Sequence, residues 1–184
     1  AVEEHGVPGA AAGVVVDGES HVAVVGRTNV DHLAPVEEST LFQVGSVTKT
    51  FAAALVVLLA EEGRLDLDDP VARHLPDLAR QAPDLLLADT TVEQLLSHQA
   101  GFDGDHSLTH RTREAADLAA ARRLFPPGDG FSYSNGGFSL AGAVVEAVTG
   151  TAFADAVGSR LLAPLGAAAA CFRGDDAVTH SVAA

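Results

Sequence analysis

Apolar residues near the start of the chain gather in two short runs, Ala10 to Val16 and His21 to Gly26. The pair Asp17-Gly18 separates them, and such a pair tolerates the positive φ that a tight hairpin turn requires. The pattern therefore predicts two antiparallel strands. The polar stretch from Asn29 to Ser39 contains a proline and predicts a connection that leaves the hairpin.

The strongest helical pattern runs from Ser46 to Glu62. Its larger apolar side chains recur at the spacing of one helix face, at Phe51, Leu55, Leu58 and Leu59. Most of the other positions are alanine or valine, so this helix is apolar nearly all round and is expected at the centre of the fold. Gly63 predicts its end.

Shorter helices are expected to follow. Prolines prevent one long helix between Arg64 and Asp89. Thr91 and Gln94 have the spacing of a capping box at the start of a short helix that ends at His98. Three more helices are predicted, at Thr112–Leu124, Gly137–Val148 and Thr151–Leu162. The predicted order is therefore two strands followed by a run of helices.

The composition excludes some classes of function. The 184 residues are 47% hydrophobic and 20% charged, which suits one folded domain or a large piece of one. Eleven basic residues stand against 25 acidic ones, a net charge of −14. This balance argues against a nucleic-acid or anionic-membrane partner, because both bind basic surfaces. Cys171 is the only cysteine, so no intrachain disulfide can form.

The chain contains a single lysine, Lys49, which lies three residues after Ser46. On a helix this spacing places the two Cβ atoms about 5–6 Å apart on one face. A lysine, unlike an arginine, can give up its proton in apolar surroundings and then act as a base toward a serine hydroxyl. The backbone N–H groups at the helix start would favour a negative charge developing near Ser46. The alternative is that Ser46 only caps the helix while Lys49 extends into solvent.

The single tyrosine of the chain, Tyr133, begins the triplet Tyr133-Ser134-Asn135. This triplet follows a rigid Pro/Gly turn and precedes the start of a predicted helix, so a firm scaffold presents its side chains. A tyrosine next to an ammonium can carry a proton, and an asparagine can orient both a lysine and a substrate amide. The alternative is a buried tyrosine in a turn, with the asparagine capping the helix.

Together these motifs resemble the class C β-lactamase-like serine hydrolases, a superfamily of β-lactamases, penicillin-binding carboxypeptidases, esterases and D-amino-acid peptidases. The segment Phe42 to Phe51 is similar to the family's nucleophile segment with its Ser-x-x-Lys motif. Tyr133-Ser134-Asn135 matches the family's Tyr-x-Asn motif, and residues 91–101 resemble the helix and turn between the two. Three motifs in the family's order make the resemblance specific, and it extends from Val7 to about Leu165.

The resemblance implies an α/β (α+β) fold of the β-lactamase/transpeptidase-like type, in which a helical subdomain packs on an antiparallel sheet. It implies that Ser46 is acylated by an amide, ester or β-lactam carbonyl, and that Lys49 and Tyr133 share its proton. Which of these two is the base stays open, because they would titrate as a coupled pair. Asn135 and Gln43 are implied as substrate-binding residues.

The same resemblance implies a small-molecule or peptide substrate and neither a metal nor an organic cofactor. It suggests a periplasmic, cell-envelope or secreted location, with a cytoplasmic one also open. It does not indicate an oligomeric state.

The chain departs from the family pattern toward its C-terminus. The third motif of the family, Lys-Thr-Gly or His-x-Gly on a strand, is not found, and the sequence contains no methionine. We therefore expect residues 1–184 to be a single partial domain, truncated at both ends, with an incomplete sheet and no activity on its own. The alternative function is that of a non-catalytic relative that binds peptides or assembles, with a vestigial site.

The remaining candidate residues fit structural roles better. His98 is expected to hold its turn through its ring nitrogens, and Cys171 is expected to be inert. Two groups lack the spacing of a metal site: the loop residues Asp103, Asp105, His106 and His110, and the acidic run Asp66, Asp68 and Asp69.

Overall fold

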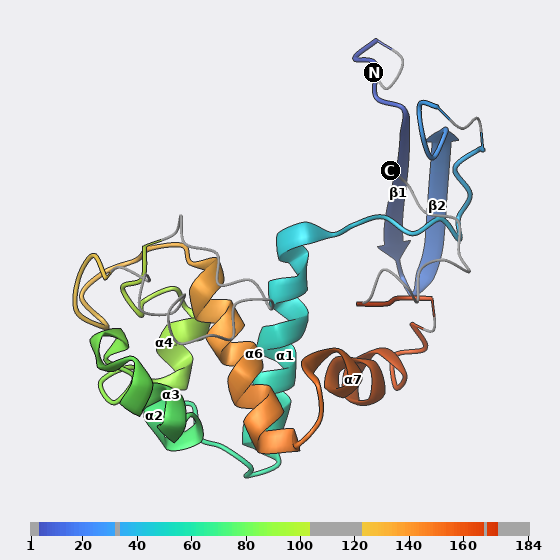
Figure 1. The fold of residues 1–184 in the computed structure, drawn as a ribbon. Helices are drawn as coiled ribbons and strands as arrows, with labels where there is room; N and C mark the ends of the chain where they lie inside the picture. Colours follow the sequence, from blue (N-terminus) through green and yellow to red (C-terminus); the bar gives the residue numbers. More distant parts are fainter. Residues whose placement is uncertain (1–3, 32–33, 104–122, 168, 173–184) are drawn as a thin grey trace. The chain divides into compact units, whose positions relative to one another are not determined.

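The computed structural model describes residues 4–31, 34–103, 123–167 and 169–172. The chain divides into two compact units (Figure 1). Ala1–Gly45 and Leu162–Ala184 form the first unit, and Ser46–Leu161 form the second.

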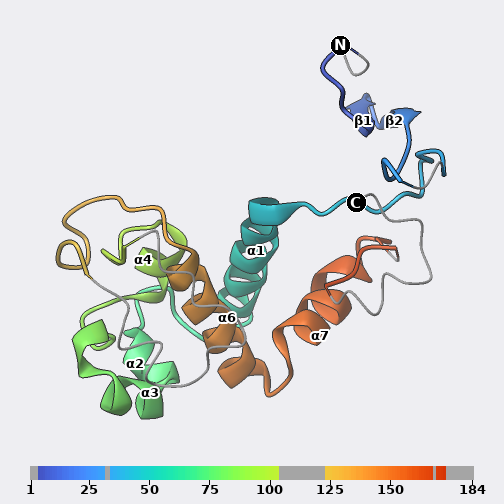
Figure 2. The same ribbon diagram turned by 45° about the horizontal axis from the view of Figure 1, so that its top comes forward.

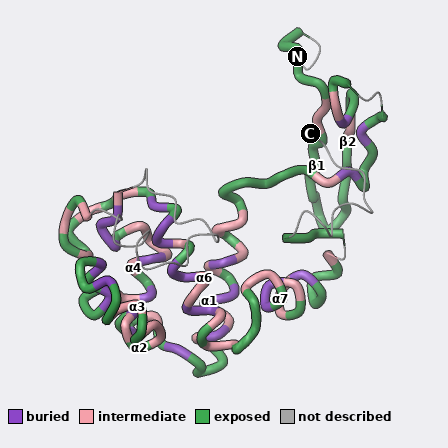
Figure 3. Tube along the Cα trace, viewed as in Figure 1, coloured by how far each residue is buried: buried purple, intermediate pink, exposed green. Residues whose placement is uncertain are grey.

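The first unit contains the predicted hairpin. Strands β1 (Gly9–Val16) and β2 (Glu19–Gly26) pair antiparallel, with Val16 opposite Glu19 next to the turn. Asp17 and Gly18 form the turn with φ values of 50° and 83°, as the Asp-Gly pair predicts. Most side chains of both strands are exposed, which is visible as green along the hairpin in Figure 3.

Two long helices form the core of the second unit. Helix α1 (Thr48–Glu61) follows the 3₁₀ turn η1 (Gly45–Val47), and it packs along α6 (Asn135–Thr149), as both ribbon views show (Figures 1 and 2). The contact buries apolar side chains from both helices, among them Leu55, Leu59, Leu140, Val144 and Val145. This confirms the expectation that the first helix is central.

Short helices fill the chain between α1 and α6, because prolines interrupt it. They are α2 (Val71–His74), α3 (Pro76–Gln81), the 3₁₀ turn η2 (Pro83–Leu85) and α4 (Val92–Leu96). The predicted capping box is present at the start of α4. Gln94 N–H donates to Thr91 Oγ1 at 3.2 Å, and Thr91 N–H donates to Gln94 Oε1 at 3.0 Å.

After α6, helix α7 (Phe153–Val157) continues as one π-helical turn, η3 (Gly158–Leu162). The helix predicted at 151–162 therefore begins at Phe153 and loses its α-helical geometry at Gly158. Most of the helix predicted at 112–124 lies outside the described residues. No single helix in the described part of the chain is long and apolar enough to cross a membrane; α6 with α7 and η3, bent by 74°, meets the length and composition criteria only as a pair.

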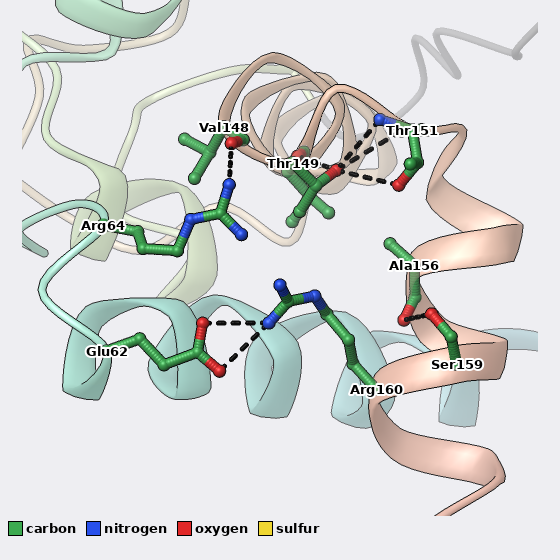
Figure 4. Close-up of polar contacts among 9 residues, drawn as sticks. Glu62, Arg64, Val148, Thr149, Thr151, Ala156, Ser159 and Arg160 are labelled. Carbon is green, nitrogen blue, oxygen red and sulfur yellow. Dashed lines mark hydrogen bonds and ion pairs between the residues drawn. The ribbon is translucent and has the colours of Figure 1, made fainter.

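Two arginines join the ends of the long helices in the second unit (Figure 4). Arg160 Nη1 donates to both carboxylate oxygens of Glu62, at 3.0 and 2.9 Å, and Arg64 Nη2 donates to the carbonyl of Val148. The contacts connect the end of α1 with η3 and with the last turn of α6.

Candidate active site

Ser46 and Lys49 lie at the start of α1, where the helical repeat brings their side chains together. Ser46 is in the 3₁₀ turn, and Lys49 is the second residue of the helix. Lys49 Nζ donates to Ser46 Oγ at 3.2 Å, so the lysine reaches the hydroxyl as the three-residue spacing predicts. The helix has no side-chain cap at this end.

The Tyr133-Ser134-Asn135 segment meets this pair from a distant part of the chain. Tyr133 Oη donates to Ser46 Oγ at 2.7 Å across 87 positions of sequence. Lys49 Nζ donates to Asn135 Oδ1 at 2.7 Å. Asn135 is the first residue of α6, so the two core helices begin at the same place. This confirms the prediction that both motifs come together around one serine.

The positive charge of Lys49 acts on Tyr133. The lysine Nζ lies 4.8 Å from the centre of the tyrosine ring. Hydrogen bonding by Lys49, followed by hydrogen bonding with Ser46, lowers the pKa of the Tyr133 phenol below its ordinary value of 10.0, because both partners favour the phenolate. The Tyr133 side chain is also open to the outside, at 44% exposure. The site therefore holds a phenol that ionises more readily than usual next to a serine hydroxyl.

Gln43 belongs to the first unit, and its side chain is exposed. The structure thus brings four of the five expected site residues together, namely Ser46, Lys49, Tyr133 and Asn135. The expected contact of Gln43 with substrate stays a prediction.

The turn after α4 is hydrogen-bonded to the Tyr133 segment. His98 Nδ1 accepts from Ser134 N–H at 3.0 Å, so His98 holds the motif through a ring nitrogen, as expected of a structural histidine. Ser134 in turn is buried, and its Oγ accepts from Gly137 N–H at 3.1 Å as the N-cap of α6.

Two supporting residues were not found by the sequence reasoning. The centre of the Phe138 ring lies 5.6 Å from Lys49 Nζ. Its position three residues after Asn135 on the predicted helix could have indicated that it shares a face with Asn135. Arg123 is half-buried and donates to the carbonyls of Ala100 and Leu85 and, at 2.7 Å, to Thr90 Oγ1. Burial lowers the pKa of its guanidinium to about 10. Nothing in the sequence marks this arginine as buried.

The described residues contain no group of three or more His, Cys, Asp or Glu side chains arranged to hold a metal ion. Asp105, His106 and His110 lie outside the described residues. In the acidic run, the Asp69 carboxylate is occupied by Asp66 N–H, Arg73 and His74. The hydrogen bond from the Asp66 backbone lowers the pKa of Asp69 below 3.8.

Ser46 thus contacts both a lysine and a tyrosine at the start of α1. The family model and the named relatives place the chain in the serine hydrolase superfamily that includes β-lactamases, penicillin-binding proteins and esterases. The chain belongs to the Beta-lactamase family, whose model matches residues 1–184. This agrees with the resemblance drawn from the motifs.

The names of the relatives indicate different activities. The chain is 39% identical over 170 residues to penicillin-binding protein 4 of Amycolatopsis lactamdurans, covering 89% of this chain and 44% of that protein. It is 35% identical over 154 residues to esterase EstB of Burkholderia gladioli, and this match covers 72% of this chain and 38% of the esterase. The fold is similar to that of a class C β-lactamase with a TM-score of 0.83 at 27% identity, covering 99% of this chain and 50% of that one. The α+β, β-lactamase/transpeptidase-like fold is therefore established, and the chain spans half or less of the length of these relatives.

Proposed function

We propose that Ser46 is the nucleophile of a serine hydrolase that cleaves amide, ester or β-lactam bonds through an acyl-enzyme. The observation that carries this proposal is the double contact of Ser46 Oγ with Lys49 Nζ at 3.2 Å and with Tyr133 Oη at 2.7 Å. Serine hydroxyls become nucleophilic when an adjacent group can accept their proton. The exposure of Tyr133 supports access of a substrate to this serine.

In this mechanism Ser46 Oγ attacks the substrate carbonyl carbon, and its proton passes to the Lys49–Tyr133 pair. The oxyanion is stabilised in part by backbone N–H groups at the start of α1. The tetrahedral intermediate then collapses, the C–N or C–O bond breaks, and the leaving group takes the proton from the pair. Water then attacks the acyl carbon and gives a proton to the pair. The second tetrahedral intermediate collapses, the bond between the acyl carbon and Ser46 Oγ breaks, Oγ takes the proton back from the pair, and the carboxylic acid product leaves.

Asn135 keeps Lys49 directed at Ser46 in this proposal, because its amide oxygen accepts from Nζ at 2.7 Å. Its amide nitrogen would remain available as a donor to a substrate carbonyl. No step requires a metal or an organic cofactor. The substrate is a small molecule or a peptide, consistent with relatives named as a penicillin-binding protein and an esterase.

The first test is to map the covalent adduct. The full-length protein is incubated with a fluorophosphonate and separately with a labelled penicillin, and the modified peptide is identified by mass spectrometry. We expect the label on Ser46 and none in Ser46→Ala. Ser159→Ala is a suitable control, because Ser159 is bound within its own helix to the carbonyl of Asp155 at 2.8 Å. A label on another residue, with Ser46 unmodified, would overturn the assignment. Absence of any label would favour the non-catalytic alternative.

A further inference from the structure

His98 occupies an unusual backbone conformation in the turn after α4. Its φ is 60°, in the left-handed region that residues other than glycine rarely adopt. Such a conformation costs about 1–2 kcal/mol for an L-residue, so the surroundings must stabilise it. The conformation lets both the main chain and the ring of His98 meet the segment that carries Tyr133.

Both backbone amides that flank Tyr133 bind to this one histidine. Ser132 N–H donates to the carbonyl of His98 at 2.9 Å, and Ser134 N–H donates to its Nδ1 at 3.0 Å. Since the two amides lie on either side of Tyr133, they fix the position from which its side chain extends toward Ser46. One residue thus holds the Tyr133 backbone at two points.

The imidazole also packs against the Tyr133 ring. The two ring centres are 4.4 Å apart with planes tilted by 34°. On its other sides the imidazole contacts Phe138 at 5.2 Å and Phe131 at 5.6 Å. Phe131 and Phe138 thus hold the imidazole in place, and the imidazole limits displacement of the Tyr133 side chain, whose hydroxyl donates to Ser46 Oγ at 2.7 Å.

The hydrogen bond from Ser134 requires a specific protonation state of His98. Nδ1 accepts a hydrogen bond here, so it carries no proton, and in the neutral ring the hydrogen is on Nε2. Burial, followed by the charge of Lys49, lowers the pKa of His98 below 6.5 and so favours this neutral form. Lys49 of α1 and Tyr133 are titratable groups that face the ring, and α6 presents the uncharged ring of Phe138.

We propose that His98 is a positioning residue that holds Tyr133 against Ser46, and that protonation of its Nδ1 releases this hold. The inference rests on the proposed function of Ser46 and Tyr133. A proton on Nδ1 would face the Ser134 N–H, so two donors would replace a donor and an acceptor. The Ser134 hydrogen bond would then be lost, and the contact between Tyr133 and Ser46 would loosen.

The experiment compares His98→Asn with His98→Gly in the full-length protein. Both replacements adopt a φ of 60° more readily than most residues, so neither should add backbone strain at this position. The Asn side chain keeps an acceptor oxygen near the position of Nδ1 and cannot be protonated, whereas Gly removes both acceptor and ring. Acylation rates are measured against pH, and exchange of the Ser134 amide is measured by NMR.

We expect His98→Gly to acylate at least ~10-fold more slowly than wild type near neutral pH, because small displacements of a reacting group have large kinetic effects. His98→Asn should retain most of the rate. The ratio of the wild-type to the His98→Asn rate should fall when the pH drops through the lowered pKa of His98, which lies below 6.5, since only the wild type loses its acceptor. The Ser134 amide should exchange slowly in wild type and His98→Asn, and fast in His98→Gly.

Equal rates in the two variants, or a ratio that does not change with pH, would overturn the inference. A Ser134 amide that exchanges equally in all three proteins would do the same. If wild type forms no adduct at Ser46, the proposed function fails instead, and the amide exchange still decides whether His98 holds the Tyr133 segment.

Discussion

The hydroxyl of Ser46 receives two hydrogen bonds, one from Lys49 Nζ and one from Tyr133 Oη. When Lys49 is charged and Tyr133 is neutral, both groups donate hydrogen bonds to Ser46 Oγ. In this state neither of them can accept the proton of the Ser46 hydroxyl. In the proposed mechanism, one proton must leave the pair before Ser46 can be activated. The residue at position 49 must therefore be able to lose a proton or to stabilise the phenolate.

Lys49→Arg should abolish turnover even though it keeps the positive charge. Arginine does not deprotonate near neutral pH, and its planar guanidinium does not fit between Ser46 Oγ and Asn135 Oδ1 in the way a compact ammonium does. We expect at least ~100-fold slower acylation in stopped-flow assays with an ester or a β-lactam. Arg80→Lys is the control, because Arg80 forms an exposed pair with Asp77. Near-normal acylation by Lys49→Arg would exclude lysine as the base.

The ionisation of Tyr133 should depend on Lys49. Hydrogen bonding by Lys49 is the largest cause of the lowered pKa of Tyr133, so Lys49→Met should raise this pKa toward 10.0. The phenolate absorbance of Tyr133 is obtained as the difference between proteins with and without Tyr133→Phe, titrated against pH. In wild type the phenolate should form at lower pH than in Lys49→Met. Identical titrations would show that the ammonium does not act on this phenol.

At the scale of elements, regular apolar patterns made much of the fold predictable. The hairpin was predicted from its valine runs and the Asp-Gly turn. The helices α1 and α6 were predicted from apolar positions at helical spacing, such as Leu55 and Leu59, which are buried. The contact between Ser46, Lys49 and Tyr133 followed from motif spacing together with the family resemblance. The structural role of His98 was expected, but its left-handed backbone and its hydrogen bonds to the Tyr133 segment could not be predicted, because they depend on tertiary contacts that no local pattern reveals.

The turn at Gly101 offers a test of this support. Gly101 has a φ of 79°, and a Cβ added there would lie 2.1 Å from the carbonyl oxygen of Phe125. Its own carbonyl accepts from Leu124 N–H at 2.8 Å, so the turn and the segment leading to Tyr133 are in direct contact. The glycine is therefore required both by backbone conformation and by space.

Gly101→Ala should destabilise the protein by at least ~3 kcal/mol, because the two segments must separate to admit the methyl group. Gly63→Ala is the matched control: Gly63 has a φ of 68° with nothing within 4 Å of an added Cβ, so only the strain of about 1–2 kcal/mol applies. Urea denaturation measures both free energies of unfolding. Equal losses in the two variants would contradict the close contact with Phe125.

At the scale of the whole molecule, contacts between distant parts of the chain hold the second unit together. Buried apolar side chains such as Leu55, Leu59 and Leu140 form its core, whereas the pair Arg160–Glu62 joins positions 98 residues apart and is partly exposed, with side-chain exposures of 31% and 38%. Partly exposed ion pairs contribute little, since solvent screens them and two long side chains must be ordered.

Arg160→Gln should therefore lower the free energy of unfolding by no more than about 1 kcal/mol, and the loss should shrink in high salt. A double-mutant cycle with Glu62→Gln separates the pair from the other contacts of each side chain. A coupling energy well above this value, or one that salt does not change, would mean that the pair contributes as a buried one does.

The common starting point of α1 and α6 has an electrostatic consequence. Each helix carries about half a positive charge at its N-terminus, and the Lys49–Asn135 hydrogen bond brings the two starts together around an ammonium. The chain as a whole has a net charge of −14. Ser46 thus lies next to two positive helix ends and an ammonium, on a chain whose net charge is strongly negative. An anionic substrate would be repelled by the chain at long range and attracted by the site only within the last few ångströms. Salt screens the long-range repulsion more than the short-range attraction. The association rate constant of such a substrate should therefore increase as the ionic strength rises.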